Sequence, residues 1–248
     1  MGFSELYDLR SEAGPTLVVD FADWAAAASV GCFAPGVSGQ LVAQSAEYAA
    51  CLGLGTYEPG DNQAFTFHGV TVDLSWSRAA AARPGGPQRG DVWECRSGPL
   101  TIIAVETPTM ASESRYDVAN AHSLVALARK TLLVFQVARE LGVRQVYSGL
   151  LGAGPRFGSR PLALLLHMLL LPDGMELKLH FPILWTCSTH NVRRMERRLA
   201  EIVEHMLGDL RELGVSTMAE ALSVILTWEL FSSHNDFDIL GEGRFDGK

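Results

Sequence analysis

A glycine-rich segment contains the residues of this sequence that are best suited to bind an anion. It runs from Val146 to Pro161, reads VYSGLLGAGPRFGSRP and has glycines at 149, 152, 154 and 158. A strand pattern leads into the glycines, and a helix pattern with proline in its first turn follows them. Glycine lets the backbone approach a ligand closely, and free N–H groups at a loop and a helix start attract phosphate. We therefore predict a phosphate or diphosphate site, with positive charge from Arg156 and Arg160; an ordinary strand-to-helix turn is the alternative.

Three familiar nucleotide-binding motifs do not fit the chain. A Walker loop ends in Gly-Lys-Ser/Thr, whereas this segment has Gly158-Ser159-Arg160. A Rossmann loop has GxGxxG and an acid at the end of the next strand, but here the spacing is GxGxxxG and the strand 176–184 ends in Pro-Ile-Leu. A methyltransferase needs glycines directly after its first strand, where this chain has Trp24 and alanines.

The apolar pattern along the chain predicts an α/β fold. Strands are expected at Thr16–Ala22, Leu100–Val105, Val143–Leu150 and Glu176–Leu184, with a hairpin of Ala64–Phe67 and Val70–Leu74 around His68-Gly69. Helices are expected at Gln40–Leu52, Asp117–Leu141, Pro161–Leu171, Val192–Leu213 and Thr217–Phe231, and an exposed loop at Arg78–Gly90. Alternating strands and helices predict a mixed, largely parallel sheet flanked by helices. We expect this α/β domain over residues 1–189, a helical C-terminal extension packed on it at 190–231, and a loose tail at 232–248.

Composition and charge narrow the class of protein. The 248 residues are 48% hydrophobic and 19% charged, which is enough to bury a core, and the net charge of −8 argues against a basic nucleic-acid surface. The four cysteines form no CxxC pair. Met1–Arg10 lacks the pattern of a signal peptide, and the apolar run Leu162–Leu171 is about half of a membrane span. We expect a cytoplasmic or nuclear protein that is not secreted and does not contact membranes or nucleic acid.

Two sets of motifs together resemble a known family. The strand end Asp20-Phe21-Ala22 precedes a Gly/Ser loop, and the later loop has the form G-x-x-G-x-G-x-x-F-G-x-x-P. This order is similar to that of the microbial-type poly(ADP-ribose) glycohydrolases, in which a "DFA"-like strand end and a "GxWGCGxFGxDP"-like loop surround ADP-ribose. The resemblance covers roughly residues 16–184 and implies a macrodomain-like fold. It also implies ADP-ribose, or an ADP-ribosylated protein, as partner. The implied ligand-binding residues are Asp20, Phe21, Gly149, Gly152, Ala153, Gly154, Phe157 and Gly158.

The catalytic signature of that family is absent from this chain. The family has a triple-glycine loop followed by Gln-Glu-Glu, which holds the catalytic acid, whereas the corresponding residues 29–44 contain no carboxylate. The nearest acid is Glu47, which the turn of the helix is expected to direct away from the ligand. Without a general acid–base, glycosidic cleavage loses its main contributor. We therefore expect a pseudoenzyme that binds ADP-ribose; a hydrolase with a relocated acid and an interaction protein without a pocket are the alternatives.

Several other polar residues have more than one interpretation. Asp20 or Asp23 could accept a hydrogen bond from an adenine amino group or could cap a loop, and Phe157 could stack on a base or anchor the core. Cys187 and His190 have metal-ligand spacing but no second pair nearby, so we expect neither a metal nor another cofactor. The apolar face of the last helix needs a cover, which its own sheet, a partner protein or a second copy of the chain could supply.

Overall fold

The computed structural model describes residues 2–4, 16–21, 41, 45–53, 63–71, 74–76, 92–94, 99–106, 121–151, 160–180 and 189–228. The chain folds as two compact units. Unit 1 comprises residues 1–107, 132–149 and 172–182, and unit 2 comprises residues 108–131, 150–171 and 183–248. These units are groups of contacting segments, and the domain bounds predicted above at residues 189 and 231 stay a prediction.

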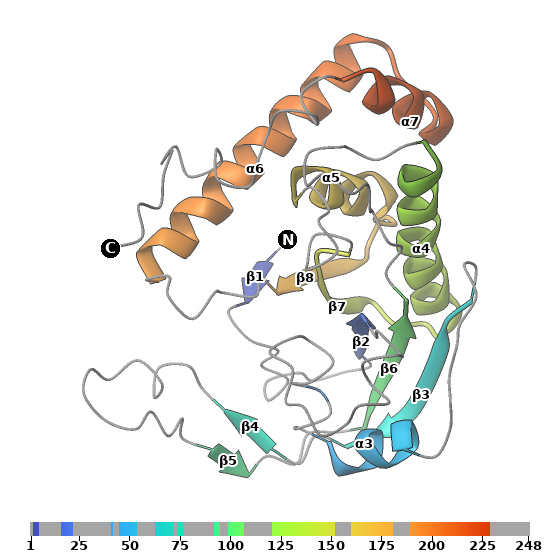
Figure 1. Ribbon diagram of the computed structural model, residues 1–248, viewed down its shortest axis with the longest axis vertical. Coiled ribbons are helices and arrows are strands. Elements are labelled where there is room, and N and C mark those ends of the chain that lie inside the picture. The colour runs from blue at the N-terminus through green and yellow to red at the C-terminus, as the bar shows by residue number, and fades with distance from the viewer. Residues whose placement is uncertain are drawn as a thin grey trace. The chain divides into compact units, whose positions relative to one another are not determined.

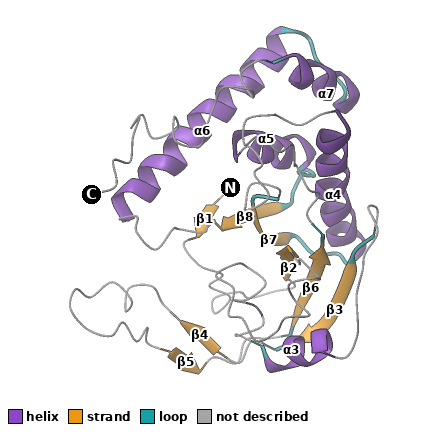
Figure 2. Cartoon of the chain, viewed as in Figure 1, coloured by secondary structure: helices purple, strands orange, loops and turns teal. Residues whose placement is uncertain are grey.

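Unit 1 is built on a six-stranded sheet with the order β1-β8-β7-β2-β6-β3 (Figure 1). Its strands are β1 (Gly2–Ser4), β2 (Thr16–Phe21), β3 (Phe65–Val70), β6 (Leu100–Val105), β7 (Gln145–Gly149) and β8 (Glu176–His180). Neighbouring strands are parallel except for β3, which runs antiparallel to β6. A separate antiparallel pair consists of β4 (Leu74–Trp76) and β5 (Val92–Glu94), coloured orange with the other strands in Figure 2. The predicted mixed, largely parallel α/β sheet is confirmed; the sequence analysis missed β1 and β5 and included only the first residue of β4.

Central strands of this sheet are apolar on both faces. Leu17, Val18 and Val19 of β2 are completely buried, as expected for a parallel strand between two neighbours. Helix α3 (Ala46–Gly53) packs on one of these faces. There it forms a core cluster with strands β2, β3, β6 and β7, made of Val18, Leu41, Tyr48, Leu52, Val70, Leu100, Ile102 and Tyr147. Leu41, Tyr48 and Leu52 follow helical spacing, so this part of the sequence specifies one apolar face.

The predicted hairpin around His68-Gly69 is wrong. The chain passes through these residues as the single strand β3, which pairs with β6 along its length. Between His68 and Val70 the register shifts, and Gly69 has a φ of +73°. One glycine in the left-handed region inserts an extra residue in a strand as a bulge, whereas a hairpin turn of this length needs two residues of turn geometry. The glycine signal was real, but it marks a bulge.

Glycine ends helix α4 (Ala121–Glu140) as the sequence predicts. Gly142 has a φ of +67° and its N–H donates to the carbonyl of Arg139, while the Val143 N–H donates to that of Ala138. This pair of bonds is the Schellman arrangement, which satisfies the last carbonyls of the helix. It sends the chain directly into β7.

Unit 2 contains the described helices α5 (Arg160–Leu170), α6 (Thr189–Glu212) and α7 (Met218–Thr227). Helix α5 packs against α6, whose buried stripe repeats at helical spacing and consists of Leu199, Val203, Met206 and Leu210. His167 of α5 is buried and its Nδ1 lies 2.6 Å from the Ala163 carbonyl. Burial lowers the pKa of His167 to about 4, so it is neutral at pH 7. None of the described helices is both long enough and apolar enough to cross a membrane.

Helix α7 begins with a capping box, and its stability should respond to acid. The Thr217 side chain accepts from the Glu220 N–H, and Glu220 accepts from the N–H groups of Ser216 and Thr217. The bond from Ser216, and then that from Thr217, lowers the pKa of Glu220 from 4.5 to about 2. Because the folded pKa is the lower one, this contribution is complete above pH 4.5 and is lost as the pH falls toward 2.

We therefore expect Glu220→Gln to lower the free energy of unfolding at neutral pH. The difference from wild type should shrink as the pH falls from about 5 to about 2. Urea unfolding at a series of pH values measures it. A difference that stays constant over this range would contradict the capping assignment.

Candidate functional site

The sheet topology places a ligand-binding position between β2 and β7. After β2 the chain continues to β3 and β6 on one side of the sheet order, and after β7 it continues to β8 on the other side. In open α/β sheets, ligands bind at the carboxyl ends of the strands, where successive connections leave in opposite directions. This switch point therefore lies between the end of β2, at Asp20 and Phe21, and the end of β7, at Gly149.

Strand pairing supports this position. The β2–β7 ladder ends at Val18 and Tyr147, although both strands continue. On the outer sides, β2 stays paired with β6 as far as Phe21, and β7 stays paired with β8 as far as Gly149. Of these three described pairings, the one between β2 and β7 therefore ends earliest along the strands, and this end lies at the switch point.

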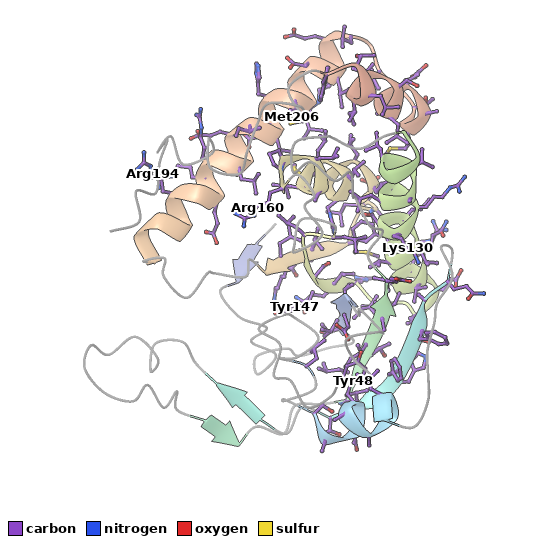
Figure 3. All side chains as sticks on the ribbon, in the orientation of Figure 1. Tyr48, Lys130, Tyr147, Arg160, Arg194 and Met206 are labelled. Carbon is purple, nitrogen blue, oxygen red and sulfur yellow. The ribbon has the colours of Figure 1, made fainter. Side chains whose placement is uncertain are left out.

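Asp20 is held at this edge by a buried tyrosine. Side chains alternate along a strand, so Asp20 faces the same side of the sheet as Val18, which is the side that α3 covers. The Tyr48 hydroxyl donates to Asp20 Oδ2 at 2.5 Å, and both residues are completely buried. Burial, and next the negative charge of Asp20, raise the pKa of Tyr48 far above its usual value. The Tyr48 hydroxyl therefore keeps its proton and donates it from α3 to the end of β2; Figure 3 labels Tyr48.

A second tyrosine of the same cluster, Tyr147, lies on β7 near the carboxyl end of that strand. Tyr147 of β7 is two residues before Gly149, and its hydroxyl accepts a hydrogen bond from Lys178 Nζ at 3.0 Å. The same Nζ lies 5.0 Å from the centre of the Tyr147 ring, within the range of a cation–π contact. Tyr147 and Lys178 are paired in register on β7 and β8. The two buried tyrosines, which are labelled in Figure 3, therefore belong to one cluster but bind different partners.

Glu47 lies toward the opposite end of the strands from the predicted ligand site, near the amino end of β6. Its Oε2 accepts the N–H of Thr71 at 2.8 Å, directly after β3 ends at Val70. Val70 pairs with Leu100, the first residue of β6, whereas Asp20 pairs with Ala104. Four residues of strand separate these two positions of β6, or about 13 Å. The helix turn directs Glu47 away from the predicted ligand edge, as the sequence led us to expect.

Another carboxylate, which the sequence analysis missed, does follow a strand at the ligand edge. Glu106 comes directly after Val105, which ends β6 beside Phe21 of β2. Its side chain is half-buried. The signal was available, because an acid directly after a predicted buried strand marks the same edge as Asp20.

The structure describes only some of the predicted ligand-binding residues. Phe21, of which only the backbone is described, and Gly149 end adjacent strands at the switch point, and Asp20 directly precedes Phe21. The other predicted positions lie outside the described residues; they are Gly152, Ala153, Gly154, Phe157 and Gly158, together with Asp23 and Cys187. A ligand contact for any of them stays a prediction. The sequence analysis missed Tyr48, whose only signal was helical spacing with Leu41 and Leu52.

Comparison with known proteins identifies the fold. No protein-family model and no curated protein sequence matches the chain. Two crystal structures of poly(ADP-ribose) glycohydrolase from Deinococcus radiodurans in complex with ADP-ribose are similar to it. One has a TM-score of 0.53 and 16% identity, and covers 76% of this chain and 79% of its own. The other has a TM-score of 0.52 and 14% identity, with 76% and 78% covered. The chain thus has the macrodomain-like fold of the microbial poly(ADP-ribose) glycohydrolases, which its motifs predicted.

Proposed function

We propose that this chain binds ADP-ribose, or a related nucleotide diphosphate, at the carboxyl edge of its sheet beside β2 and β7. The switch point between these strands carries the proposal, because the glycine-rich segment follows β7 in the sequence. We expect the diphosphate to meet the N–H groups of Gly152–Gly158. Both similar crystal structures contain ADP-ribose, which supports this choice of ligand.

Asp20 supports this site in a way that differs from the direct contact predicted above. Its carboxylate is completely buried and receives the Tyr48 hydroxyl. We propose that its first role is to hold α3 against β2, next to the strand end. An additional bond from an adenine amino group is compatible with its chemistry, because a carboxylate has about four lone-pair positions. That contact, a ligand contact of Phe21 and stacking on Phe157 remain predictions.

We further propose that the chain is a catalytically degenerate relative of the glycohydrolases. The segment that corresponds to the catalytic signature contains no carboxylate, and Glu47 binds Thr71 toward the far edge of the sheet. A general acid must come within hydrogen-bond reach of the glycosidic bond, directly or through one water. Glu47 therefore does not serve a ligand at the switch point.

Binding is tested with the intact chain and ADP-ribose. We expect the melting temperature to rise with ligand concentration and calorimetry to give one site. A ligand at 100 times its dissociation constant stabilises the native state by about 2.7 kcal/mol. ADP and ribose 5-phosphate are the controls that separate the diphosphate from the sugar. If millimolar ADP-ribose produced neither a thermal shift nor heat, the interaction-protein alternative would replace this proposal.

We expect the protein to release no ADP-ribose from ADP-ribosylated proteins beyond a buffer blank. The test is chromatography of free ADP-ribose after prolonged incubation, with Glu47→Gln and Glu106→Gln measured beside wild type. Release that Glu106→Gln abolishes would identify a relocated acid at the ligand edge and would establish an active hydrolase. Release that only Glu47→Gln abolishes would contradict our placement of the ligand edge.

A further inference from the structure

The last residue pair of the β2–β7 ladder has a cation directly beside it. The ladder ends where Val18 of β2 pairs with Tyr147 of β7, and Tyr147 in turn pairs with Lys178 of β8. Paired residues share a face of the sheet, so these three side chains form one row on the face that α3 covers. Tyr147 and Lys178 therefore lie at the base of the switch point, where the pairing of β2 with β7 stops.

Strand β7 contributes no side chain to the next row toward the carboxyl end. Side chains on one face alternate, so this row holds the positions of Asp20 on β2, Gly149 on β7 and His180 on β8, the last two of which are paired. About 7 Å of strand separates the two rows. Because Gly149 has no side chain, a ligand at the end of β7 can come closer to Tyr147 and Lys178 than any other residue at position 149 would allow.

The Lys178 ammonium is held toward β7 and the switch point. Its Nζ donates to the Tyr147 hydroxyl at 3.0 Å and lies 5.0 Å from the centre of the Tyr147 ring. The Lys178 side chain is half-buried, and salt screens the charge of such a group less than that of an exposed one. An ammonium has three N–H donors, and a phenol oxygen that accepts one of them keeps its own proton to donate. Two different donor groups, one of them charged, therefore meet at the base of the switch point.

We infer that Lys178 binds a phosphate group of the ligand from the β8 side of the switch point, with its ammonium oriented by Tyr147. On the β2 side the completely buried Asp20 carboxylate repels such a group, and the charge of Lys178 on the other side of β7 offsets this repulsion. The inference rests on the function proposed above and deepens it, because it adds to the site a charged residue that selects an anionic ligand over a neutral one.

The experiment compares Lys178→Met with Arg144→Met in the intact chain. Lys178→Met keeps an unbranched side chain over the Tyr147 ring but removes the ammonium, and Arg144→Met removes one positive charge from an exposed side chain just before the amino end of β7. Calorimetry measures the affinity for ADP-ribose at low and at high sodium chloride concentration. We expect Lys178→Met to weaken binding about tenfold or more at low salt and to reduce the salt dependence of the affinity. Arg144→Met should change the affinity less than about twofold.

Circular dichroism before each titration identifies the variants that fold. If Lys178→Met does not fold, Lys178→Gln takes its place, because an amide can still donate to the Tyr147 hydroxyl without carrying a charge. An unchanged affinity in the folded variant, a loss with unchanged salt dependence, or an equal loss in Arg144→Met would each overturn the role of Lys178 while leaving the proposed function in place. No binding by wild type would overturn the proposed function, and this role with it.

Discussion

Gly154→Val is expected to abolish ADP-ribose binding by a protein that still folds. If the diphosphate meets backbone N–H groups in the glycine-rich segment, a branched side chain at position 154 occupies the space of the phosphate oxygens. Gly154→Ala places a smaller group at the same position and should weaken binding less. Circular dichroism confirms the fold, and calorimetric titration with ADP-ribose measures the loss.

Gly208→Val is the matched control for this substitution. Gly208 lies in α6, and a Cβ added there lies within 4 Å of no atom outside the adjacent helix backbone, so we expect valine to leave both fold and binding unchanged. A folded Gly154→Val variant that binds as tightly as wild type would show that the glycines only turn the chain. The anion site predicted from their spacing would then be withdrawn.

Tyr48→Ala is expected to cause the largest loss of stability of any substitution considered for α3. The side chain is completely buried and belongs to the cluster that joins α3 to the sheet. Truncating a buried aromatic residue to alanine costs about 3–5 kcal/mol, and here it also removes the donor to the buried Asp20 carboxylate. Urea unfolding followed by circular dichroism measures the free energy of unfolding.

Glu47→Ala provides the comparison within the same helical turn. Glu47 is exposed and binds only one described group, the Thr71 N–H, so its loss should cost about 1 kcal/mol or less. Similar losses for the two variants would mean that the Tyr48 ring contributes little to the core. That result would contradict the cluster described for α3.

Strands with continuous apolar runs could be predicted from the sequence because burial on both faces leaves a clear local signal. Leu100–Val105 forms β6 with the predicted bounds, and Thr16–Phe21 forms all but the last predicted residue of the first strand. Gly69 was misinterpreted because a single glycine signals either a turn or a bulge, and only the pairing of β3 with β6 decides between them. Strand β1 has three residues and depends on its pairing with β8, which no local pattern records.

The candidate site shows the same division between local and long-range information. Asp20 could be identified because it ends a predicted buried strand, where ligands of α/β proteins bind. Its bond with Tyr48 could not, because that contact depends on the side of the sheet that α3 covers. The contact of Glu47 could not be predicted either, because it is made with Thr71 at the end of β3, and the extent of that strand was mispredicted.

The strand order of the sheet also has a consequence for folding during synthesis. Strand β2 is made before β7, and Thr16 and Gln145, which pair across these strands, are 129 residues apart. At ribosomal elongation rates, those residues take about 10 s to add, far longer than helices and loops need to form. Throughout that interval Leu17, Val18 and Val19 lack their β7 neighbour, so the nascent chain exposes apolar surface of the kind that makes incompletely folded chains prone to aggregate. Slow, late closure of the sheet is therefore built into this topology, because non-local pairing limits the folding rate.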